Sequence, residues 1–387
     1  MGTDFFKTRI LTQTTIVKPS TPDWMSNFLS ANQNLVRFDR FMQAALYDPV
    51  HGYYSRADRV FGPEGDFVTA PELSSLFGRT LACALREAVR DCGGHIWEFG
   101  AGRGLLARDI LTELGDEVTC YHIVDVSGAL QTLQRETLQA GGIDTDARVR
   151  WETQLPDTLE GVLIGNEVLD AMPVRLFAWN AGTVCERFVG LSDAAQRTVA
   201  WQDLPPDDEL RHAVESLHQT HGPWPDDYVS EWPEQAIAFV RTITQALKGV
   251  ALFVDYGFGA GEFYHPQRST GTLVAHHRHK MSDEVLDRPG EQDITAHVDF
   301  SALFEAQHAA GGELLGYTSQ AAFLLHNGLL EKLDASASPA RRQAIQTLVN
   351  PSEMGELFKV MAWCRGVNPD HWALTRTLAQ MDRSRQL

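Results

Sequence analysis

The sequence has few cysteines, few basic residues and no long apolar run. Its five cysteines are scattered and form no C-x-x-C pair, so we expect neither a disulfide scaffold nor a structural zinc site. No apolar run approaches the roughly 20 residues needed to span a bilayer, and we therefore expect no integral membrane segment. Lys and Arg number 33 against 51 Asp and Glu, a net charge of −18. This balance argues against nucleic-acid binding, because phosphate contacts need clustered basic side chains.

The first 20 residues lack the basic and then apolar layout of a secretory signal. They hold Lys7, Arg9 and Lys18 against one acid, which leaves a cleaved organellar leader open as an alternative. Scattered cysteines without pairs are typical of a reducing compartment. We therefore expect a cytoplasmic protein.

The chain divides into two regions by its pattern of apolar residues. Residues 1–92 hold helical patterns around a turn-rich stretch at 47–67. In residues 93–387, short apolar strands alternate with helices. That alternation is typical of βαβ units and of a mainly parallel sheet covered on both faces. We predict an α/β fold with a helical N-terminal region.

One segment within the second region differs in composition. Residues 203–234 hold nine acids against one base, Arg211, and so contribute 8 of the 18 excess negative charges. The segment also holds five prolines, which break regular structure. We interpret it as part of an insertion between two βα units, at about 201–247, that steers a basic protein partner to the site.

The clearest chemical signal is a glycine-rich string between a predicted strand at 96–99 and a predicted helix: Glu98-Phe99-Gly100-Ala101-Gly102-Arg103-Gly104. Glycines let the backbone approach a ligand closely, and a helix N-terminus favours negative charge. Asp125 ends the next predicted strand, 21 residues after Gly104, where an acid can accept hydrogen bonds from a ribose diol. Together these features predict a nucleoside-type ligand, although the loop alone is also compatible with a tight structural turn.

Two residues of the loop distinguish between nucleoside ligands. Leu105 stands where the dinucleotide fingerprint has its third glycine, and Glu98 precedes the glycines. A carboxylate at that position repels a pyrophosphate but suits a cation. S-adenosylmethionine carries a sulfonium and an ammonium and no phosphate, so the loop favours a methyl donor over NAD. A dinucleotide oxidoreductase remains the less favoured alternative.

A second motif follows the predicted strand at 162–164: Gly165-Asn166-Glu167-Val168-Leu169-Asp170-Ala171-Met172-Pro173. Glu167 and Asp170 are three residues apart, on one face if a helical turn begins there. Two carboxylates suit the binding and orientation of a guanidinium or ammonium group. We therefore predict Glu167 and Asp170 as catalytic residues, with Asn166 positioning the acceptor. A helix-capping cluster is the structural alternative.

These strings resemble the MidA family of class I S-adenosylmethionine-dependent methyltransferases, over residues 36–365. Asp125 is a departure, since the family more often has Glu there. Further matching strings are Phe41-Met42, Ala45-Leu46-Tyr47-Asp48-Pro49, Gly52-Tyr53-Tyr54, Gly65-Asp66-Phe67-Val68-Thr69-Ala70-Pro71-Glu72-Leu73-Ser74, Val254-Asp255-Tyr256-Gly257, Gln292-Asp293-Ile294-Thr295-Ala296-His297 and Thr318-Ser319-Gln320.

The resemblance implies a Rossmann-like sheet, mostly parallel, with an antiparallel last strand. It implies S-adenosylmethionine as cofactor, with Gly65, Asp66 and Thr69 in a segment that folds over it and 292–297 on the substrate side. The residues expected to hold the cofactor are then Glu98, Gly100, Ala101, Gly102, Gly104, Asp125, Gly65, Asp66 and Thr69. Eukaryotic members are mitochondrial protein-arginine methyltransferases that act in the assembly of respiratory complex I. The resemblance therefore implies an arginine-bearing protein substrate, and the mitochondrial matrix if the source is eukaryotic.

Some alternatives stay open at the level of sequence. The protein is either an enzyme or a non-catalytic assembly factor that binds S-adenosylmethionine, and an enzyme could use another acceptor. His276-His277-Arg278-His279 lacks partners at metal-ligand spacing, so we interpret it as a polar loop and expect no metal. The oligomeric state is not encoded in any motif.

Overall fold

The computed structural model describes residues 21–55, 68–193, 198–278, 280–334 and 336–387. Its largest sheet has eight strands, in the order β15-β16-β10-β5-β2-β3-β4, with β14 paired to β10. Strands β2 to β5 and β10 run parallel, whereas β16 lies antiparallel between β10 and β15. These strands are β2 (His95–Phe99), β3 (Cys120–Val124), β4 (Val149–Glu152), β5 (Leu159–Asn166), β10 (Leu247–Phe258), β14 (Val298–Asp299), β15 (Glu313–Ser319) and β16 (Phe358–Arg365). The predicted α/β class and antiparallel last strand are confirmed.

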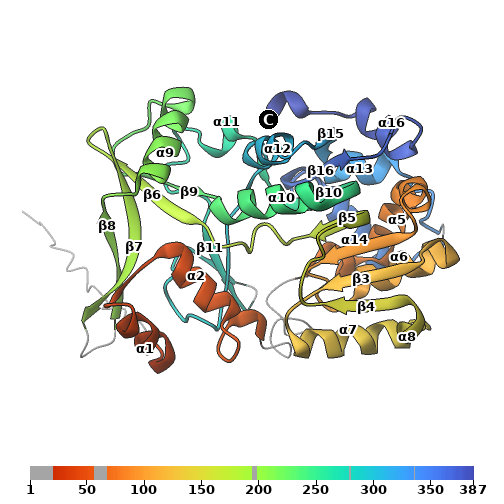
Figure 1. Ribbon diagram of the computed structural model, residues 1–387, viewed down its shortest axis with the longest axis horizontal. Coiled ribbons are helices and arrows are strands. Elements are labelled where there is room, and N and C mark those ends of the chain that lie inside the picture. Colours follow the sequence, from red (N-terminus) through yellow and green to blue (C-terminus); the bar gives the residue numbers. More distant parts are fainter. Residues whose placement is uncertain (1–20, 56–67, 194–197, 279, 335) are drawn as a thin grey trace, which may run out of the picture.

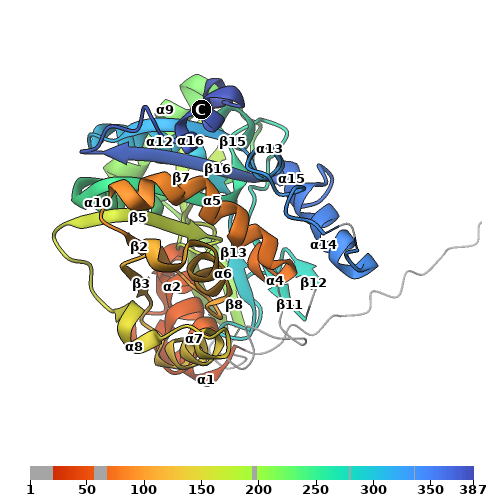
Figure 2. The ribbon, with the colours of Figure 1, turned by 90° about the vertical axis from the view of Figure 1, so that its right-hand side faces the viewer.

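The central strands are apolar on both faces because helices cover both. In β10, Val250 and Leu252 pack into one apolar layer with α5 (Ser75–Asp91) and α6 (Leu105–Leu114), which lie together in Figure 2. The alternate residue Phe253 packs into a second layer with α10 (Glu234–Ala246) and α12 (Phe300–Ala309). The period of two in a strand places neighbouring side chains on opposite faces.

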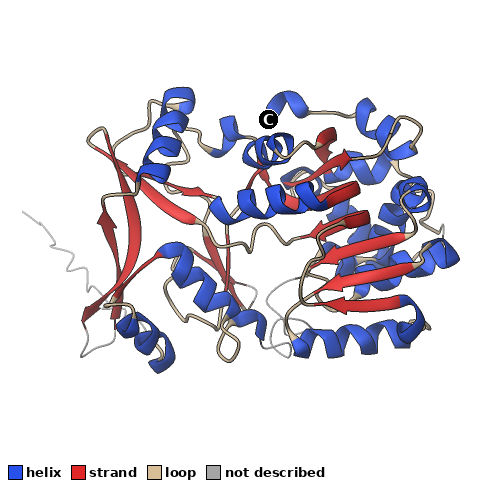
Figure 3. Cartoon of the chain, viewed as in Figure 1, coloured by secondary structure: helices blue, strands red, loops and turns tan. Residues whose placement is uncertain are grey.

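A second lobe lies beside the main sheet (Figures 1 and 3). Its antiparallel sheet has the order β1-β7-β6-β9, with β8 paired to β7, and a smaller sheet has the order β12-β11-β13. These strands are β1 (Leu35–Arg37), β6 (Arg175–Asn180), β7 (Thr183–Asp193), β8 (Thr198–Leu204), β9 (Tyr228–Trp232), β11 (Val274–His277), β12 (Lys280–Ser282) and β13 (Asp293–Thr295).

The N-terminal helices pack on this second lobe. Met25 and Leu29 of α1 and Phe38 of α2 share an apolar cluster with Val189 of β7 and Ile294 of β13. The remaining helices are α1 (Asp23–Ala31), α2 (Phe38–Tyr47), η1 (Tyr53–Ser55), α4 (Ala70–Leu73), η2 (Gly115–Glu117), α7 (Gly128–Ala140), α8 (Thr145–Arg148), α9 (Asp208–His221), α11 (Ala260–Phe263), α13 (Gln320–His326), α14 (Pro339–Val349), α15 (Met354–Leu357), α16 (Ala373–Gln380) and η3 (Ser384–Gln386). In the described part of the chain, no helix combines the length and apolarity needed to cross a membrane.

Two expectations about this lobe need correction. Residues 35–37, expected among helices and loops, form β1 and pair with β7. The proline-rich segment 203–234 is not irregular, because α9 and β9 lie within it. Its prolines stand at the joints, with one pair between β8 and α9, one pair between α9 and β9, and one before α10. Strands β6 and β7 of the second sheet precede residue 201, and α10 packs against the main sheet. The insertion at about 201–247 stays a prediction. The division at residue 92 stays a prediction.

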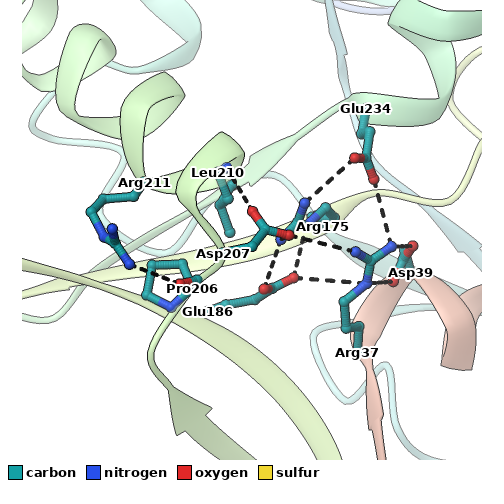
Figure 4. A network of polar contacts seen from close by, with 9 residues as sticks. All are labelled: Arg37, Asp39, Arg175, Glu186, Pro206, Asp207, Leu210, Arg211 and Glu234. Atoms are coloured by element: carbon teal, nitrogen blue, oxygen red, sulfur yellow. Dashed lines mark hydrogen bonds and ion pairs between the residues drawn. The ribbon is translucent and has the colours of Figure 1, made fainter.

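A buried ion network joins the second lobe to α2 and α10 (Figure 4). The Arg175 side chain, only 1% exposed, contacts Glu186 at 2.7 Å, Asp207 at 2.8 Å and Glu234 at 3.4 Å. Arg37 contacts the last of these carboxylates at 3.6 Å. Since Asp207 and Glu234 belong to the acidic segment, part of its negative charge is paired with arginine within the protein itself.

Candidate active site

The glycine-rich string turns the chain from β2 into α6, as predicted. Gly100, Gly102 and Gly104 have φ values of +65°, +50° and +79°, in the left-handed region that favours glycine. At Gly100 a side chain would meet Val168 Cγ2 at 2.8 Å. The loop therefore packs directly against the second predicted motif.

Glu98, at the start of this string, is buried, with 2% of its surface exposed. Its Oε2 accepts a hydrogen bond from the Tyr121 hydroxyl at 2.9 Å. Burial raises the pKa of Glu98 to about 8 because removal from water disfavours the charged form. A cation bound nearby would favour ionisation of this carboxyl group.

Asp125 directly follows β3 and is fixed to the glycine loop by Gln134. The Gln134 Nε2 donates to Asp125 Oδ2 at 2.8 Å and to the Gly102 carbonyl at 3.0 Å. Its Oε1 accepts from Trp151 Nε1 at 2.9 Å. Burial raises the pKa of Asp125. Gln134 was not predicted, because within its helix it resembles any other polar residue.

The second motif is a turn and not a helical turn, so the condition for a shared helical face of Glu167 and Asp170 is not met. Asn166 ends β5, and Glu167 has a φ of +55°, a strained value for a residue other than glycine and one that clusters at functional sites. Glu167 Oε1 accepts from the Ala70 backbone N at 3.3 Å and from Asn166 Nδ2 at 3.0 Å. Burial, with the charge of Asp170, raises the pKa of Glu167 to about 8.

Asp255, at the end of the neighbouring strand β10, holds this turn in shape. Its Oδ2 accepts hydrogen bonds from the backbone N of Val168, Leu169 and Asp170 at 3.1, 2.9 and 3.4 Å. The side chain of Asp170 is buried, and burial raises its pKa to about 6. Asp255 was not predicted as a site residue, although it lies in the string 254–257 that matches the family.

A single cavity of about 750 Å³ brings the two motifs together. Nearly all predicted site residues that the structure describes line it: Glu98, Gly100, Ala101, Gly102, Asp125, Asn166, Glu167, Asp170 and Thr69. Gly104 does not line it and is the N-cap residue of α6. Gly65 and Asp66 lie outside the described residues. Tyr47, Tyr54 and Asp293 also line the cavity, from the second lobe.

No metal centre is evident in the parts of the chain that the structure describes, where no three His, Cys, Asp or Glu side chains are grouped to hold an ion. His276 and His277, predicted in a polar loop, lie on β11 and do not line the cavity, and His279 lies outside the described residues. The side chains that line the cavity include carboxyl, amide and tyrosine groups.

Residues 76–318 match the family model of S-adenosyl-L-methionine-dependent methyltransferases. The chain belongs to the MidA family of these enzymes. Among its relatives, the mitochondrial protein arginine methyltransferase NDUFAF7 homolog of Drosophila melanogaster is 30% identical, over 86% of this chain and 82% of the relative. The protein arginine methyltransferase NDUFAF7 of Homo sapiens is also 30% identical, over 83% of this chain and 78% of the relative.

Two crystal structures from Burkholderia thailandensis resemble the MidA chain closely. One, bound to S-adenosylhomocysteine, is 42% identical with a TM-score of 0.85, and covers 96% of this chain and 100% of that chain. The other, a native structure of a protein of the same superfamily, is 43% identical with a TM-score of 0.83 and the same coverage.

S-adenosylmethionine is the cofactor of this family, which confirms the prediction from the glycine loop. The lining of the cavity fits it. Glu98 and Asp125 offer carboxylates for an ammonium group and for ribose hydroxyls, and there is no dinucleotide glycine at Leu105. The protein is a methyltransferase by family and fold.

Proposed function

We propose that the protein transfers a methyl group from S-adenosylmethionine to a guanidinium nitrogen of a protein arginine side chain. The observation that carries this proposal is the pair of carboxyl groups in the cavity, the partly buried Glu167 and the buried Asp170. Two carboxylates can bind two nitrogens of one guanidinium group. The names of the fly and human relatives support the same acceptor.

S-adenosylmethionine supplies an electrophilic methyl group on a positively charged sulfur. In the proposed reaction a guanidinium nitrogen forms the new N–C bond in line with the C–S bond that breaks, and S-adenosylhomocysteine leaves. Glu167 and Asp170 bind the other two nitrogens and orient the attacking one, while Asn166 positions the group. The nitrogen then loses a proton, which a carboxylate with a raised pKa such as Glu167 can accept.

An arginine-bearing, basic protein is the partner that this chemistry requires. The fly and human relatives are named as mitochondrial. We propose that this protein acts in the cytoplasm, or in the mitochondrial matrix if its source is eukaryotic. We further propose that its acceptor is a subunit of a respiratory complex during assembly.

The test follows tritiated methyl groups from S-adenosylmethionine into proteins of the native lysate. Glu167→Gln and Asp170→Asn should each lower label transfer by about 100-fold to 10,000-fold, while calorimetry still detects binding of S-adenosylhomocysteine. The matched control is Glu305→Gln, an exposed acid on α12, which should leave transfer unchanged. Acid hydrolysis of the labelled protein should yield methylarginine.

Three outcomes would contradict the proposal or part of it. Full transfer in both variants would remove Glu167 and Asp170 from the mechanism. Cofactor binding without transfer to any protein would instead favour the non-catalytic assembly factor. Label recovered on another side chain would keep the methyltransferase and change its acceptor.

A further inference from the structure

Part of the cavity wall comes from outside the methyltransferase sheet. Tyr47 ends α2, Tyr54 lies in η1 and Asp293 begins β13, and all three line the cavity. None of them belongs to the glycine loop or to the motif at 165–173. The second lobe therefore forms one wall of the cavity, and this wall lies outside the two cofactor motifs.

Tyr54 and Asp293 form a hydrogen-bonded pair. The Tyr54 hydroxyl donates to both carboxylate oxygens of Asp293, at 2.9 and 3.1 Å. Asp293 is 4% exposed. Burial, together with the charges of Asp293 and Asp170, raises the pKa of Tyr54, so this hydroxyl keeps its proton and remains a donor. The pair therefore holds a carboxylate at a fixed position on the wall.

Two hydrogen bonds attach this wall to the catalytic turn. The Ala296 backbone N donates to the Asp170 carbonyl at 3.0 Å. The Tyr47 hydroxyl donates to the Ala171 carbonyl at 2.9 Å. The rings of Tyr47 and Tyr54 have centroids 5.4 Å apart. Asp293 and two aromatic rings are thus held next to the backbone of the turn that carries Asp170.

We propose that Asp293, together with Asp170 and the two tyrosine rings, forms the acceptor subsite and selects a planar guanidinium group over an ammonium group. A guanidinium group binds carboxylates through a fork of N–H donors and stacks on aromatic faces, whereas an ammonium group is a compact, strongly hydrated charge. Aromatic rings also attract a cation placed over their faces. This subsite rests on the proposed arginine methylation.

The test measures acceptor binding apart from catalysis. Full-length protein saturated with S-adenosylhomocysteine is titrated with Nα-acetyl-arginine N-methylamide, and in parallel with the corresponding lysine compound, by saturation-transfer NMR. The wild type should bind the arginine probe at least about tenfold more tightly than the lysine probe. Asp293→Asn should weaken arginine binding by about tenfold to 100-fold, with unchanged affinity for S-adenosylhomocysteine.

The matched control is Glu291→Gln, which removes an equal charge two residues away, at an exposed side chain that does not line the cavity. It should bind both probes like the wild type. Tyr54→Phe keeps the ring and removes the hydrogen bond to Asp293, so it should weaken arginine binding less than Asp293→Asn does. It also provides the test if Asp293→Asn does not fold.

The inference is overturned if Asp293→Asn and Tyr54→Phe bind the arginine probe like the wild type, if the wild type binds neither probe, or if it binds both equally. Each of these results leaves S-adenosylhomocysteine binding and label transfer intact, and so leaves the proposed function standing. If the wild type transfers no label to any protein, that result counts against the proposed function instead.

Discussion

At the scale of single residues, Gln134 joins separate parts of the predicted cofactor site by hydrogen bonds. It is fully buried and makes three hydrogen bonds, to Gly102, Asp125 and Trp151. The first two partners belong to the glycine loop and to the acid expected to bind the ribose. One amide group therefore sets the distance between two parts of the cofactor site.

Replacement of Gln134 by methionine tests this role with little change in volume. The Gly102 carbonyl and Asp125 lose their donor, so the free energy of unfolding should fall by about 1–3 kcal/mol. Affinity for S-adenosylhomocysteine should fall by about tenfold, because Asp125 loses the bond that orients it. Urea denaturation and calorimetry measure the two effects. Gln139→Met, on the same helix and bonded to Thr145, should leave cofactor affinity unchanged.

Glu98 predicts a proton linked to cofactor binding. Its pKa of about 8 in the buried site means that the carboxyl group is mostly protonated at pH 7. The ammonium group of a bound cofactor favours the ionised form, so binding should release protons and affinity should rise between pH 6.5 and 8. Calorimetry at pH 7 in buffers of different ionisation enthalpy counts these protons. Glu98→Gln should release fewer, and equal release by both proteins would contradict the assignment.

At the scale of elements, the main sheet could be predicted because its strands bury apolar side chains on both faces. The second sheet could not, because several of its strands bury charges. Arg175 on β6, Glu186 on β7 and Glu231 on β9 are 1%, 2% and 1% exposed. Such residues make an inward-facing position look like a surface one, which hides the period of two. The tertiary ion pair of Arg175 with Glu186 and the backbone hydrogen bonds from Thr272 and Leu273 to Glu231 compensate the cost of burial, and the sequence displays neither.

Much of the candidate site could be predicted from short strings of neighbouring residues and from Asp125 at the end of a predicted strand, and the family resemblance added Thr69 and residues 292–297. The strings 98–104 and 165–173 each carry several site residues, so their local pattern was enough to find them. Tyr54 and Asp293 are 239 residues apart, and nothing local to either one indicates the other. Asp255 was hidden for a similar reason, since its hydrogen bonds cross from β10 to the turn after β5.

Replacement of Arg175 tests whether the ion network stabilises the attachment of the second lobe to α2 and α10. Arg175→Met leaves the buried Glu186 without its bidentate partner, so the free energy of unfolding should fall by about 3–5 kcal/mol. Arg187→Met on β7 removes an exposed pair with Asp203 and should cost at most about 1 kcal/mol. Urea denaturation compares the two variants. Similar losses in both would mean that the network contributes little to the lobe.

At the scale of the whole molecule, the cavity concentrates acids in a protein that already carries a charge of −18. Glu98, Glu167 and Asp170 line it, and Asp255 lies beneath the turn, its pKa raised by burial and by the charge of Asp170. At alkaline pH the ionised carboxylates of an empty cavity repel one another and lower the stability of the protein, whereas a bound cation is attracted to them. The same arrangement therefore couples stability, pH and binding of a positively charged cofactor and acceptor.

The stability of the unliganded protein should consequently fall as pH rises from 7 to 8.5. The pKa of Glu98 and of Glu167 is about 8 in the folded protein, above the ordinary glutamate value, so the folded protein binds more protons than the unfolded chain between these values. Between pH 7 and 8.5, each of the two groups should therefore lower the free energy of unfolding by about 1 kcal/mol. His297, with a pKa lowered by burial to about 4, acts in the opposite sense, but only up to about pH 6.5, where the unfolded histidine loses its proton. Urea denaturation at the two pH values measures the change. The double variant Glu98→Gln and Glu167→Gln keeps both groups neutral and should show a much smaller fall, whereas equal slopes in the two proteins would show that these glutamates do not carry the raised pKa values.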